Sequence, residues 1–512
     1  MKPNIHAAKS IKTAGRCNAC MCDPGPKQRR ALPGLLLALL AVAMLSGCSL
    51  APVGAPTGPG PQAGPLAQCL TLFEAADNDI DQAGVRHQGL ARIAGFPYLR
   101  VNRFLASFAP EVDTTGQITT WTRHLAALDA RARQPELANL ATHLAKTGSA
   151  LEPGLATRLD ECRTRLVTAL LKQPRQLRQL RHNASVPDDY QSAWRVAGLY
   201  PLTAPVVLSR IRAWHEEAIN TFNQPLSQLT VVGQLTRWRT VQDTPSLNSV
   251  IEVPVDALGI PRLTTAGVAQ LFARHAPVWE VDVRDDNDVI GTPVWKQGPA
   301  FDTTTATQYQ QLSYSRFGGK VLLQLNYVIW FKARPGNDIY AGRFDGLTWR
   351  VTLGPDLQPL LYDSIHNCGC YHTFFPTASL QLRADLLQSD AEPPLVPQYA
   401  PPWPLVVRLE HRRHFIQRVY SLQDTGHGLP LVVQDYDSLL ALPAEQGHHS
   451  FFGRHGLVAG SERTERFILW PMGIRSPGAM RQWGRHAVAF VGRRHFDDPD
   501  LITALFERVP GP

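Results

Sequence analysis

In the segment KVLLQLNYVIWFKA, residues 320–333, every second residue from 321 to 331 has a large apolar side chain. Successive side chains of a β-strand point to opposite faces. One face therefore carries only large apolar side chains, those of Val321, Leu323, Leu325, Tyr327, Ile329 and Phe331. The other face carries Gln324, Asn326 and Trp330. The pattern predicts a long strand with one face in a core. Together with Arg350, the second face either lines a cleft for a glycan or a peptide, or is covered by another part of the chain.

The segments on both sides of this strand predict antiparallel neighbours. The strand-like run 308–315 precedes it across the turn RFGG, which predicts a hairpin. Downstream, the runs 339–353 and 359–366 flank the turn GPD and extend the hairpin into a meander.

Further elements are predicted around the meander from the same kinds of pattern. A second hairpin is expected to join 276–283 to 289–295, and more strands are expected within 404–437 and at 465–471. A helix is predicted over 476–492, because a Ser-Pro pair suited to a helix start opens that segment.

The N-terminal half has a different periodicity. Residues 66–230 carry apolar side chains at three- and four-residue spacing, which predicts helices. One such stripe consists of Leu155, Leu159, Cys162, Leu166 and Leu170. Pro135, Pro153 and Pro174 are expected to separate the elements. The predicted fold class is α+β, with a helical N-terminal domain over 66–230 followed by an antiparallel β-rich α+β domain over 231–512.

The net charge of +8 on the 512 residues suggests nucleic-acid binding at first, but the N-terminal leader accounts for most of it. Residues 1–47 carry seven basic side chains and one acidic one, so the remaining chain has 44 basic and 42 acidic side chains. A nearly neutral chain lacks the electrostatic footprint of a nucleic-acid-binding protein. We therefore expect no nucleic-acid partner.

The leader has the parts of a secretory signal. Basic residues precede an apolar run, 35–45, that is too short for the roughly 20 residues of a membrane span and long enough for a signal peptide. The run ends in LSGC at Cys48, which resembles the lipobox of bacterial lipoproteins. The resemblance implies that residues 1–47 are a signal peptide and that Cys48 is diacylated, as by palmitate. The alternative is an uncleaved N-terminal anchor.

The resemblance also implies a location in the cell. Ser49 rather than Asp follows the lipobox, which in bacterial lipoproteins favours transfer to the outer membrane, facing the periplasm. Residues 48–65, from the lipidated cysteine onward, are rich in Pro and Gly and predict a tether that cannot pack a core. Met21 is a candidate for the true start, because residues before it add length that a signal peptide does not need.

Five cysteines remain once the leader is removed, including Cys48. The other four are even in number, as expected for disulfides in an oxidising compartment. Cys69 and Cys162 lie in two predicted helices of the same segment, so we expect them to form a disulfide. The alternative is a pair of buried free thiols.

The stretch DSIHNCGCYHTFF, residues 363–375, concentrates the candidate chemistry. In a straight strand His366 and His372 would lie about 20 Å apart. One metal ion, with ligand bonds of about 2.0–2.3 Å, cannot reach both of them and the cysteines between. Gly369 adopts a positive φ at little cost, so a bend there is expected to bring Cys368 and Cys370 together.

Three kinds of site remain open for this stretch. A Cys368–Cys370 disulfide would staple the loop. Zinc or copper could be bound by His366, Cys368, Cys370 and His372 around the bend. Alternatively, Cys368 or Cys370 is a catalytic thiolate, with His366 or His372 as general base and a neighbouring Asp or Asn to orient the imidazole.

The predicted function follows from the leader and this loop. We expect a lipid-anchored cell-envelope protein of binding or structural type, with a disulfide-stabilised or metal-binding loop at 366–372. The alternative is an envelope enzyme, namely a thiol hydrolase, an acyltransferase or a redox protein. No cofactor is certain, and the membrane is the one partner that the sequence indicates; a protein or glycan partner is not identified by the sequence.

Overall fold

The computed structural model describes residues 64–240, 253–388, 391–423 and 428–509. Met21, Cys48, the signal peptide and nearly all of the tether lie outside these described residues. Within the described residues, no helix is both long and apolar enough to span a bilayer.

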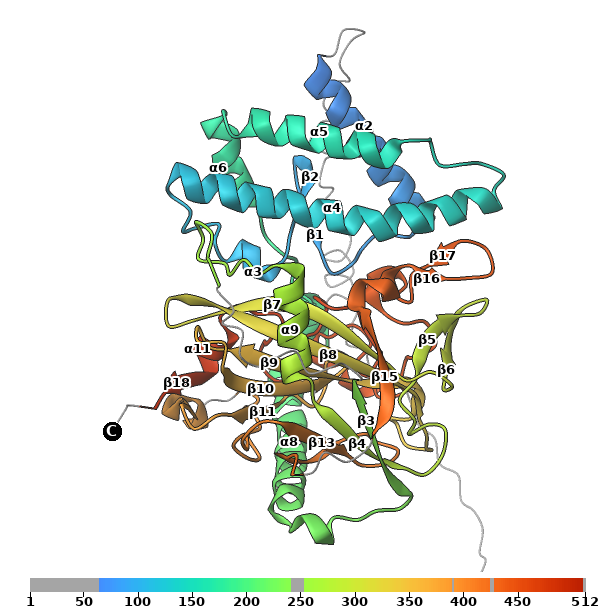
Figure 1. Cartoon of the computed structure of the whole chain (residues 1–512), viewed down its shortest axis with the longest axis vertical. Coiled ribbons are helices and arrows are strands. Elements are labelled where there is room, and N and C mark those ends of the chain that lie inside the picture. The colour runs from blue at the N-terminus through green and yellow to red at the C-terminus, as the bar shows by residue number, and fades with distance from the viewer. Residues whose placement is uncertain (1–63, 241–252, 389–390, 424–427, 510–512) are drawn as a thin grey trace, which may run out of the picture. The chain divides into compact units, whose positions relative to one another are not determined.

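Ala63–Pro512 form one compact unit that contains both the helical segment and the sheet. The division predicted at residue 230 stays a prediction. The helical elements lead, with a small two-stranded sheet inserted among them (Figure 1). Their order is α2 (Pro65–Ala83), β1 (Ala91–Ile93), β2 (Phe96–Val101), α3 (Arg103–Ala106), α4 (Thr115–Lys146), α5 (Leu155–Leu170), α6 (Pro174–Asn183), α7 (Ser192–Ala197), α8 (Tyr200–Asn223) and η1 (Leu226–Gln228).

The start of helix α4 is determined by local sequence, and its continuation past a proline is determined by packing. The Thr114 side chain accepts a hydrogen bond from the Gln117 backbone, and the Gln117 side chain caps the Thr114 backbone in return, which fixes the helix start. Pro135 lies inside α4 instead of separating two elements, so that expectation was wrong. The helix continues because one face packs Trp121, Leu125 and other side chains into the core, which outweighs the lost backbone hydrogen bond.

A buried charge cluster holds the helical elements together. Asp129 of α4 is fully buried and contacts three guanidinium groups, at 3.3 Å from Arg100, 3.2 Å from Arg133 and 2.9 Å from Arg163. Arg100 also forms a two-pronged pair with Glu136. Because each of these charges loses its water, the cluster tolerates no missing member.

The disulfide expected in this region is present. Cys69 of α2 and Cys162 of α5 are bonded, with their Cα atoms 5.2 Å apart. The bridge closes a loop with a sequence separation of 93 and fixes two helices that are far apart in the chain.

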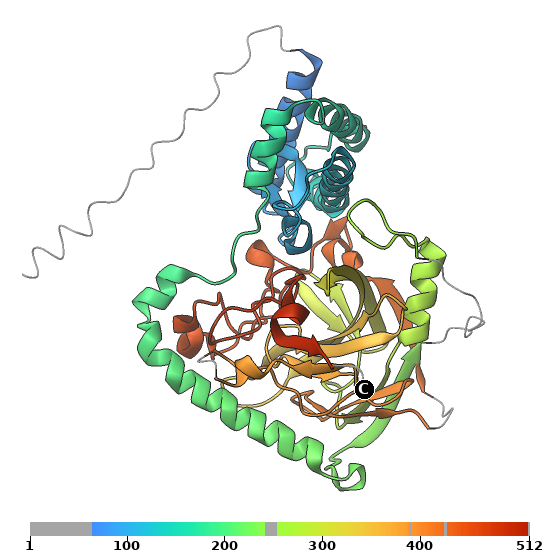
Figure 2. The same cartoon turned by 90° about the vertical axis from the view of Figure 1, so that its left-hand side faces the viewer.

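The second half of the chain builds one curled ten-stranded sheet (Figures 1 and 2). Its spatial order is β11 (Thr373–Pro376), β10 (Pro359–His366), β9 (Gly342–Leu353), β8 (Lys320–Arg334), β7 (Thr307–Phe317), β15 (Leu429–Asp435), β3 (Gln234–Thr240), β4 (Val278–Val283), β13 (Leu405–Leu409) and β14 (Ile416–Ser421). The predicted α+β class is confirmed.

Strands β7 to β10 form the predicted antiparallel meander, with Gly318 and Gly319 at positive φ in the β7–β8 turn, and β11, which was not predicted, extends it. The rest of the sheet is mixed, because β15 runs parallel to both β7 and β3, and β13 runs parallel to β4. Local sequence patterns do not predict these strand pairings, because the paired segments are far apart in the chain.

Shorter elements surround the sheet. They are α9 (Thr265–His275), β5 (Thr292–Trp295), β6 (Pro299–Asp302), β12 (Leu380–Leu382), η2 (Ala384–Gln388), η3 (Tyr436–Leu440), β16 (Leu442–Pro443), β17 (His448–His449), η4 (Arg454–Gly456), α10 (Arg466–Leu469), η5 (Trp470–Met472), α11 (Leu501–Leu505) and β18 (Phe506–Arg508).

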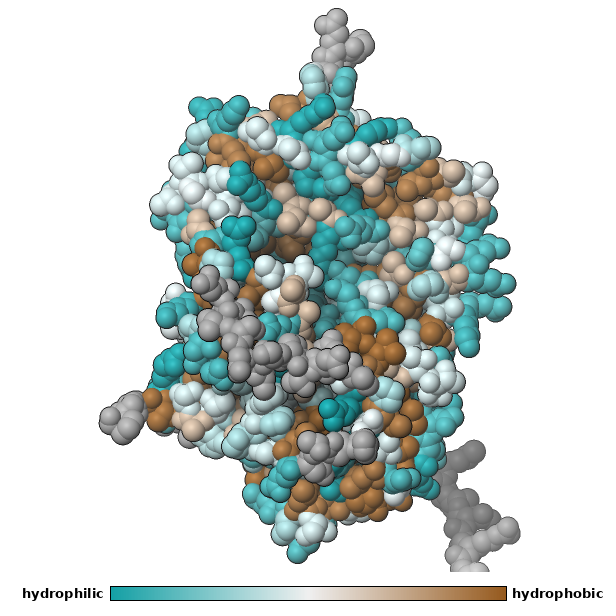
Figure 3. All heavy atoms as spheres, viewed as in Figure 1, coloured by the Kyte–Doolittle hydropathy of each residue, from teal (hydrophilic) through white to brown (hydrophobic). Residues whose placement is uncertain are grey.

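The two faces of the meander differ as the sequence predicts. The apolar face, with Tyr327 and Trp349 fully buried, packs against Phe272 of α9 and Phe222 of α8. Helix α8 runs along one side of the sheet (Figure 2). On the outside of the molecule, hydrophobic residues form separate patches among hydrophilic ones in the space-filling view (Figure 3).

The other face of the meander carries a row of polar side chains at one level. The strand register places Gln311, Asn326, Arg350 and Asp363 side by side across β7, β8, β9 and β10. The C-terminal segment 436–509 covers much of this row, mainly with turns and irregular backbone.

Three predicted elements differ from the structure. Strand β4 pairs with β3 and β13, and β5 pairs with β6, so the hairpin expected between β4 and β5 does not form. Residues 465–471 form α10 and η5 instead of a strand. Residues 476–492 are irregular rather than helical, because Gly478, Gly484 and Gly492 adopt positive φ and the backbone bonds to distant segments.

The disulfide generates the first prediction. Replacing both Cys69 and Cys162 by Ser should lower the unfolding free energy by about 3–5 kcal/mol, because the unfolded chain regains the freedom of a long loop. Urea unfolding followed by circular dichroism measures this change. Dithiothreitol should lower the urea midpoint of the wild-type protein and leave that of the double variant unchanged. Equal urea midpoints for the two proteins without reductant would contradict the prediction.

Candidate functional site: the Cys/His hairpin

The predicted bend at Gly369 is confirmed. Strand β10 ends at His366 and the chain returns as β11 from Thr373. The Gly369 amide donates to the His366 carbonyl at 2.7 Å, and the His366 amide donates to the Cys370 carbonyl at 3.0 Å. Gly369 has φ +90°, and a Cβ there would lie 2.9 Å from the Ala487 carbonyl oxygen. Both the turn and the close approach of the C-terminal segment therefore require glycine.

One end of the hairpin is fixed by a buried triad of His372, Asp363 and Arg350. The His372 Nε2 lies 2.8 Å from Asp363 Oδ2, and Arg350 Nε donates to Asp363 Oδ1 at 2.9 Å. The Arg350 guanidinium also bonds to the Phe496 carbonyl and lies 3.7 Å above the Phe496 ring. The triad thus connects β9, β10 and the C-terminal segment.

The charges of this triad are set by burial and pairing. Burial lowers the pKa of His372 to about 4, so the imidazole is neutral near pH 7 and donates its Nε2 proton to Asp363. Burial alone would raise the pKa of Asp363, but Arg350 and the His372 hydrogen bond hold it below its ordinary value. The Nδ1 atom of His372 is buried and has no hydrogen-bond partner in the described part of the chain.

The other end of the hairpin belongs to a chain of alternating carboxylates and imidazoles. His366 Nδ1 lies 3.4 Å from Asp345 Oδ1. Asp345 Oδ2 lies 2.9 Å from His414 Nδ1, and His414 Nε2 lies 3.3 Å from Asp288 Oδ1. Arg463 adds a further contact to Asp345 at 3.3 Å. All five side chains are buried.

The pKa values of the two imidazoles, His366 and His414, are shifted in opposite directions. Burial lowers the pKa of His366, which is therefore neutral near pH 7. Burial acts in the same direction on His414, but Asp288 and Asp345 outweigh it and raise the pKa of His414. The two carboxylates therefore favour the charged form of His414, and in that form His414 and Arg463 balance the charges of Asp288 and Asp345.

The two thiols lie next to each other but are not bonded. Cys368 is buried and Cys370 is half-buried, and both are free cysteines, so the predicted Cys368–Cys370 disulfide is not formed in the structure. Burial raises the pKa of Cys368, but the Cys370 hydrogen bond and Arg463 lower it below its ordinary value. The same hydrogen bond, together with burial, raises the pKa of Cys370.

The structure does not assemble the metal site or the thiol–imidazole pair that the sequence suggested. No group of three or more His, Cys, Asp or Glu among the described residues could hold a metal ion, because His366 and His372 turn to different carboxylates. The charged groups that act most strongly on the thiols are Arg463, Glu465 and Arg481 rather than imidazoles.

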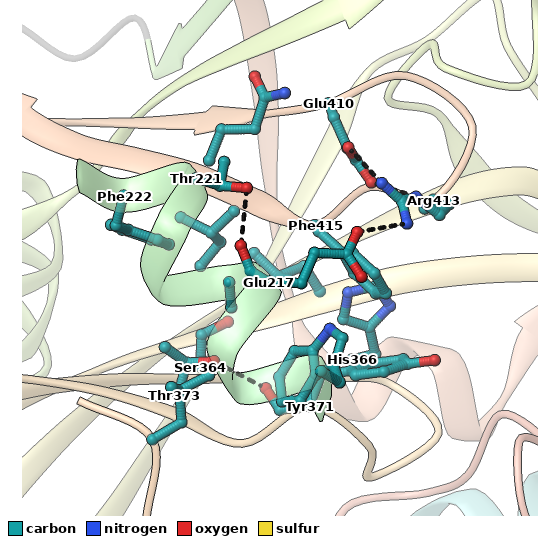
Figure 4. Close-up of a pocket in the computed structure, with 16 residues that line it drawn as sticks. Glu217, Thr221, Phe222, Ser364, His366, Tyr371, Thr373, Glu410, Arg413 and Phe415 are labelled. Carbon is teal, nitrogen blue, oxygen red and sulfur yellow. Dashed lines mark hydrogen bonds and ion pairs between the residues drawn. The ribbon is translucent and has the colours of Figure 1, made fainter. Parts of the chain in front are cut away.

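A small hollow, the hairpin cavity, lies between the hairpin, α8 and residues 410–417 (Figure 4). Its volume is about 50 Å³, enough for a few water molecules at roughly 10–15 Å³ each. The rings of Tyr371, His366 and Phe415 pack on one another at its wall, with centroids 4.5–5.4 Å apart.

The charged side chains of the hairpin cavity are already paired. Arg413 lies between two carboxylates, 3.5 Å from Glu217 and 2.6 Å from Glu410 (Figure 4). The Ser364 hydroxyl donates to the Thr348 carbonyl at 3.0 Å. The hairpin cavity therefore has neither the room nor the free charge to hold a substrate.

Sequence reasoning missed the partners of the hairpin residues. Asp288, Asp345, His414 and Arg463 come from four distant segments. An Asp-rich turn at 282–288 and several histidines after residue 410 can be read in the sequence, but no local pattern indicates that they lie together in the fold.

The free thiols give the second prediction. Alkylation of unfolded, unreduced protein should modify Cys368 and Cys370 and leave Cys69 and Cys162 unmodified, as mass mapping of peptides would show. In folded protein Cys368 should react slowly because it is buried, and the half-buried Cys370 should react slowly because its pKa is raised. A protein with no alkylated cysteine would show that the 368–370 pair is oxidised, and rapid labelling of folded protein would favour an activated thiol.

The neutral, buried His372 gives the third prediction. Above pH 6.5, the ordinary pKa of histidine, His372 is neutral in both the folded and the unfolded states. Between pH 6.5 and about pH 4, His372 is protonated in the unfolded chain but stays neutral in the folded protein. The unfolding free energy should therefore fall between pH 6.5 and 4. His372→Gln should remove on the order of 3 kcal/mol of that fall.

Denaturant unfolding at several pH values measures this effect. His182→Gln on the exposed surface of α6 is the matched control and should leave the wild-type profile unchanged. Parallel profiles for wild type and His372→Gln would contradict the neutral state of His372.

Comparison with known proteins found no relative for this chain. No family model matches the sequence, no curated protein is detectably similar, and no solved structure matches the fold.

Proposed function

We propose that the protein is a lipid-anchored cell-envelope protein of binding or structural type, in which the Cys/His hairpin is a scaffold. The observation that carries this proposal is the pairing of the hairpin residues. His372 and Arg350 are both bound to Asp363, and His366 is bound to Asp345, all of them buried. The two carboxylates, the Arg350 guanidinium, His372 Nε2 and His366 Nδ1 are thus bonded within the protein, and groups held in this way stabilise a fold and are not free to bind a substrate or a metal ion.

The envelope location is supported by the leader and by the cysteines. The LSGC motif ending at Cys48 resembles a lipobox, and the tether after it is long enough to separate the folded unit from a membrane surface. The Cys69–Cys162 disulfide suits an oxidising compartment such as the periplasm. An anchor at the outer membrane, facing the periplasm, fits both observations.

A thiol-dependent envelope enzyme is the second candidate, and one observation favours it. Cys368 and Cys370 are adjacent free thiols, and the guanidinium groups of Arg463 and Arg481 lie near enough to favour a thiolate. Its chemistry would be redox rather than acyl transfer, because the strongest neighbours of the thiols are not imidazoles. The half-buried Cys370 would be the entry point.

The lipid anchor gives the fourth prediction. In a bacterial host fed an alkyne analogue of palmitate, the wild-type protein should take up the label and partition into detergent with the membranes. Cys48→Ser should lose the label and remain an unprocessed precursor, because the acyl acceptor is gone. Cys368→Ser is the matched control and should be labelled like the wild type. Equal labelling of Cys48→Ser would overturn the proposed anchor.

A further inference from the structure

Exposed apolar side chains gather on α7, the first half of α8, α10 and η5. Six large ones are between 38% and 77% exposed, namely Val196, Leu202, Val206, Phe467, Ile468 and Trp470. We call this set the apolar patch. Single exposed apolar side chains are ordinary, but a group of them on neighbouring elements marks a surface that contacts a protein or a membrane.

The elements that carry the apolar patch pack on one another. Arg195 Nε of α7 donates to the Met472 carbonyl of η5 at 2.9 Å. A Cβ on Gly198, which ends α7, would lie 2.4 Å from Pro471 Cβ of η5. Figure 2 shows α7 and the start of α8 beside the orange-red turn formed by α10 and η5. The six side chains therefore belong to one region of the surface.

On α8 the apolar patch continues into a basic side chain. Leu202, Val206 and Arg210 follow one another at four-residue spacing, so they lie in one row on the exposed face of the helix. The opposite face, with Ala204 and Leu208, is buried against η5. The exposed row is therefore not needed to hold α8 in place and is accessible to an external partner.

The charges beside the apolar patch all have the same sign. Segments 192–213 and 466–475 together contain five arginines and neither Asp nor Glu. None of these arginines forms an ion pair with a carboxylate of the described residues. Glu465, directly before the second segment, is buried, so its carboxyl group is not part of this surface. The region thus combines exposed apolar side chains with positive charges that have no counterion in the described chain.

Two of the arginines lie over aromatic rings of the same region. The Arg466 guanidinium is 4.8 Å from the centroid of the Phe467 ring, and that of Arg475 is 5.5 Å from the Trp194 ring. A guanidinium held over a ring keeps its N–H groups free to bind phosphate oxygens. Aromatic rings with long basic side chains beside them are typical of the layer where lipid headgroups meet acyl chains.

The proposed lipid anchor keeps the apolar patch near a bilayer. Residues 49–64 join Cys48 to α2 and can span at most about 55 Å. A link of this length makes contact between the patch and the bilayer an intramolecular event, with an effective concentration on the order of millimolar. A weak interaction is then sufficient to dock the folded unit on the membrane surface.

We propose that the apolar patch docks on the surface of an anionic phospholipid bilayer. The apolar side chains enter the interfacial layer, and the arginines bind the phosphate groups of the lipids. Unpaired charge of a single sign favours a bilayer over a second copy of the chain, because two such surfaces would repel each other. The proposal rests on the proposed lipid anchor for the supply of the membrane, but the two are tested by different measurements.

Quenching by brominated phospholipids tests this contact. Bromine atoms on acyl chains quench a tryptophan only when the two touch. The lipid-modified protein is placed in vesicles of phosphatidylethanolamine and phosphatidylglycerol with brominated or ordinary chains. Bromination should lower the tryptophan emission by about a tenth to a fifth, because one or two of the 11 tryptophans reach the chains. Replacing phosphatidylglycerol by phosphatidylcholine should weaken the quenching about twofold or more.

Two pairs of variants locate the contact. Trp470→Phe should lose about half of the quenching or more, whereas Trp403→Phe, equally exposed at 37% against 38%, should keep it. Ile468→Glu should abolish the quenching, because a carboxylate would have to enter the interfacial layer. Val255→Glu is its matched control on another part of the surface, at 60% exposure against 58%, and should be quenched like the wild type.

Each outcome supports or overturns one part of the proposal. Wild-type quenching of Ile468→Glu would overturn the apolar patch as the docking surface, and equal quenching without phosphatidylglycerol would overturn the role of the arginines. An unquenched protein that carries the palmitate label would overturn the membrane contact and leave the anchor intact. If that protein also forms a crosslinked dimer that Ile468→Glu abolishes, the patch binds a second copy. Quenching by added vesicles without any palmitate label would overturn the anchor and support the patch.

Discussion

The fold of the sheet depends on the buried pair of Arg350 and Asp363. Both side chains are almost completely inaccessible, at 2% and 0% exposure. Two charges removed from water need each other and further hydrogen bonds, and the loss of one partner leaves an uncompensated charge. His372 and the Phe496 carbonyl supply those bonds. The polar row of the meander therefore requires both the hairpin and the C-terminal segment to lie where they do.

This constraint explains how an irregular segment becomes part of a core. Residues 436–509 contain little regular structure, yet Phe451, Met480 and Phe496 are fully buried. Hydrogen bonds to the sheet and to the hairpin, rather than a continuous helix or strand, hold the segment in register. The helical layer uses the same principle at Asp129. In both places polar groups specify a unique arrangement because any other would leave them unpaired.

The sequence was informative where a pattern is local. Side-chain alternation identified β8 and the meander, the flexibility of Gly369 identified the bend, and two helical cysteines identified the disulfide. No sequence pattern predicted the contacts between distant segments, such as that of Asp345 with His414 or the pairing of β15 with β7. The helix expected at 476–492 failed for the same reason, since tertiary hydrogen bonds outweighed its local pattern.

The polar face of β8 and β9 is covered by other parts of the chain at one end and lines a cavity at the other. Trp330 packs against Phe451 with centroids 5.3 Å apart, and Arg350 is sealed by Phe496, so this end of the face is covered. Towards the other end, Gln324 lines a cavity of about 230 Å³ whose walls also include residues of α3, α4 and the C-terminal segment. The Gln324 amide there is bonded within the sheet, accepting from Ser313 and donating to Thr352, so the side chain is held in place beside the cavity without a partner from the other layers.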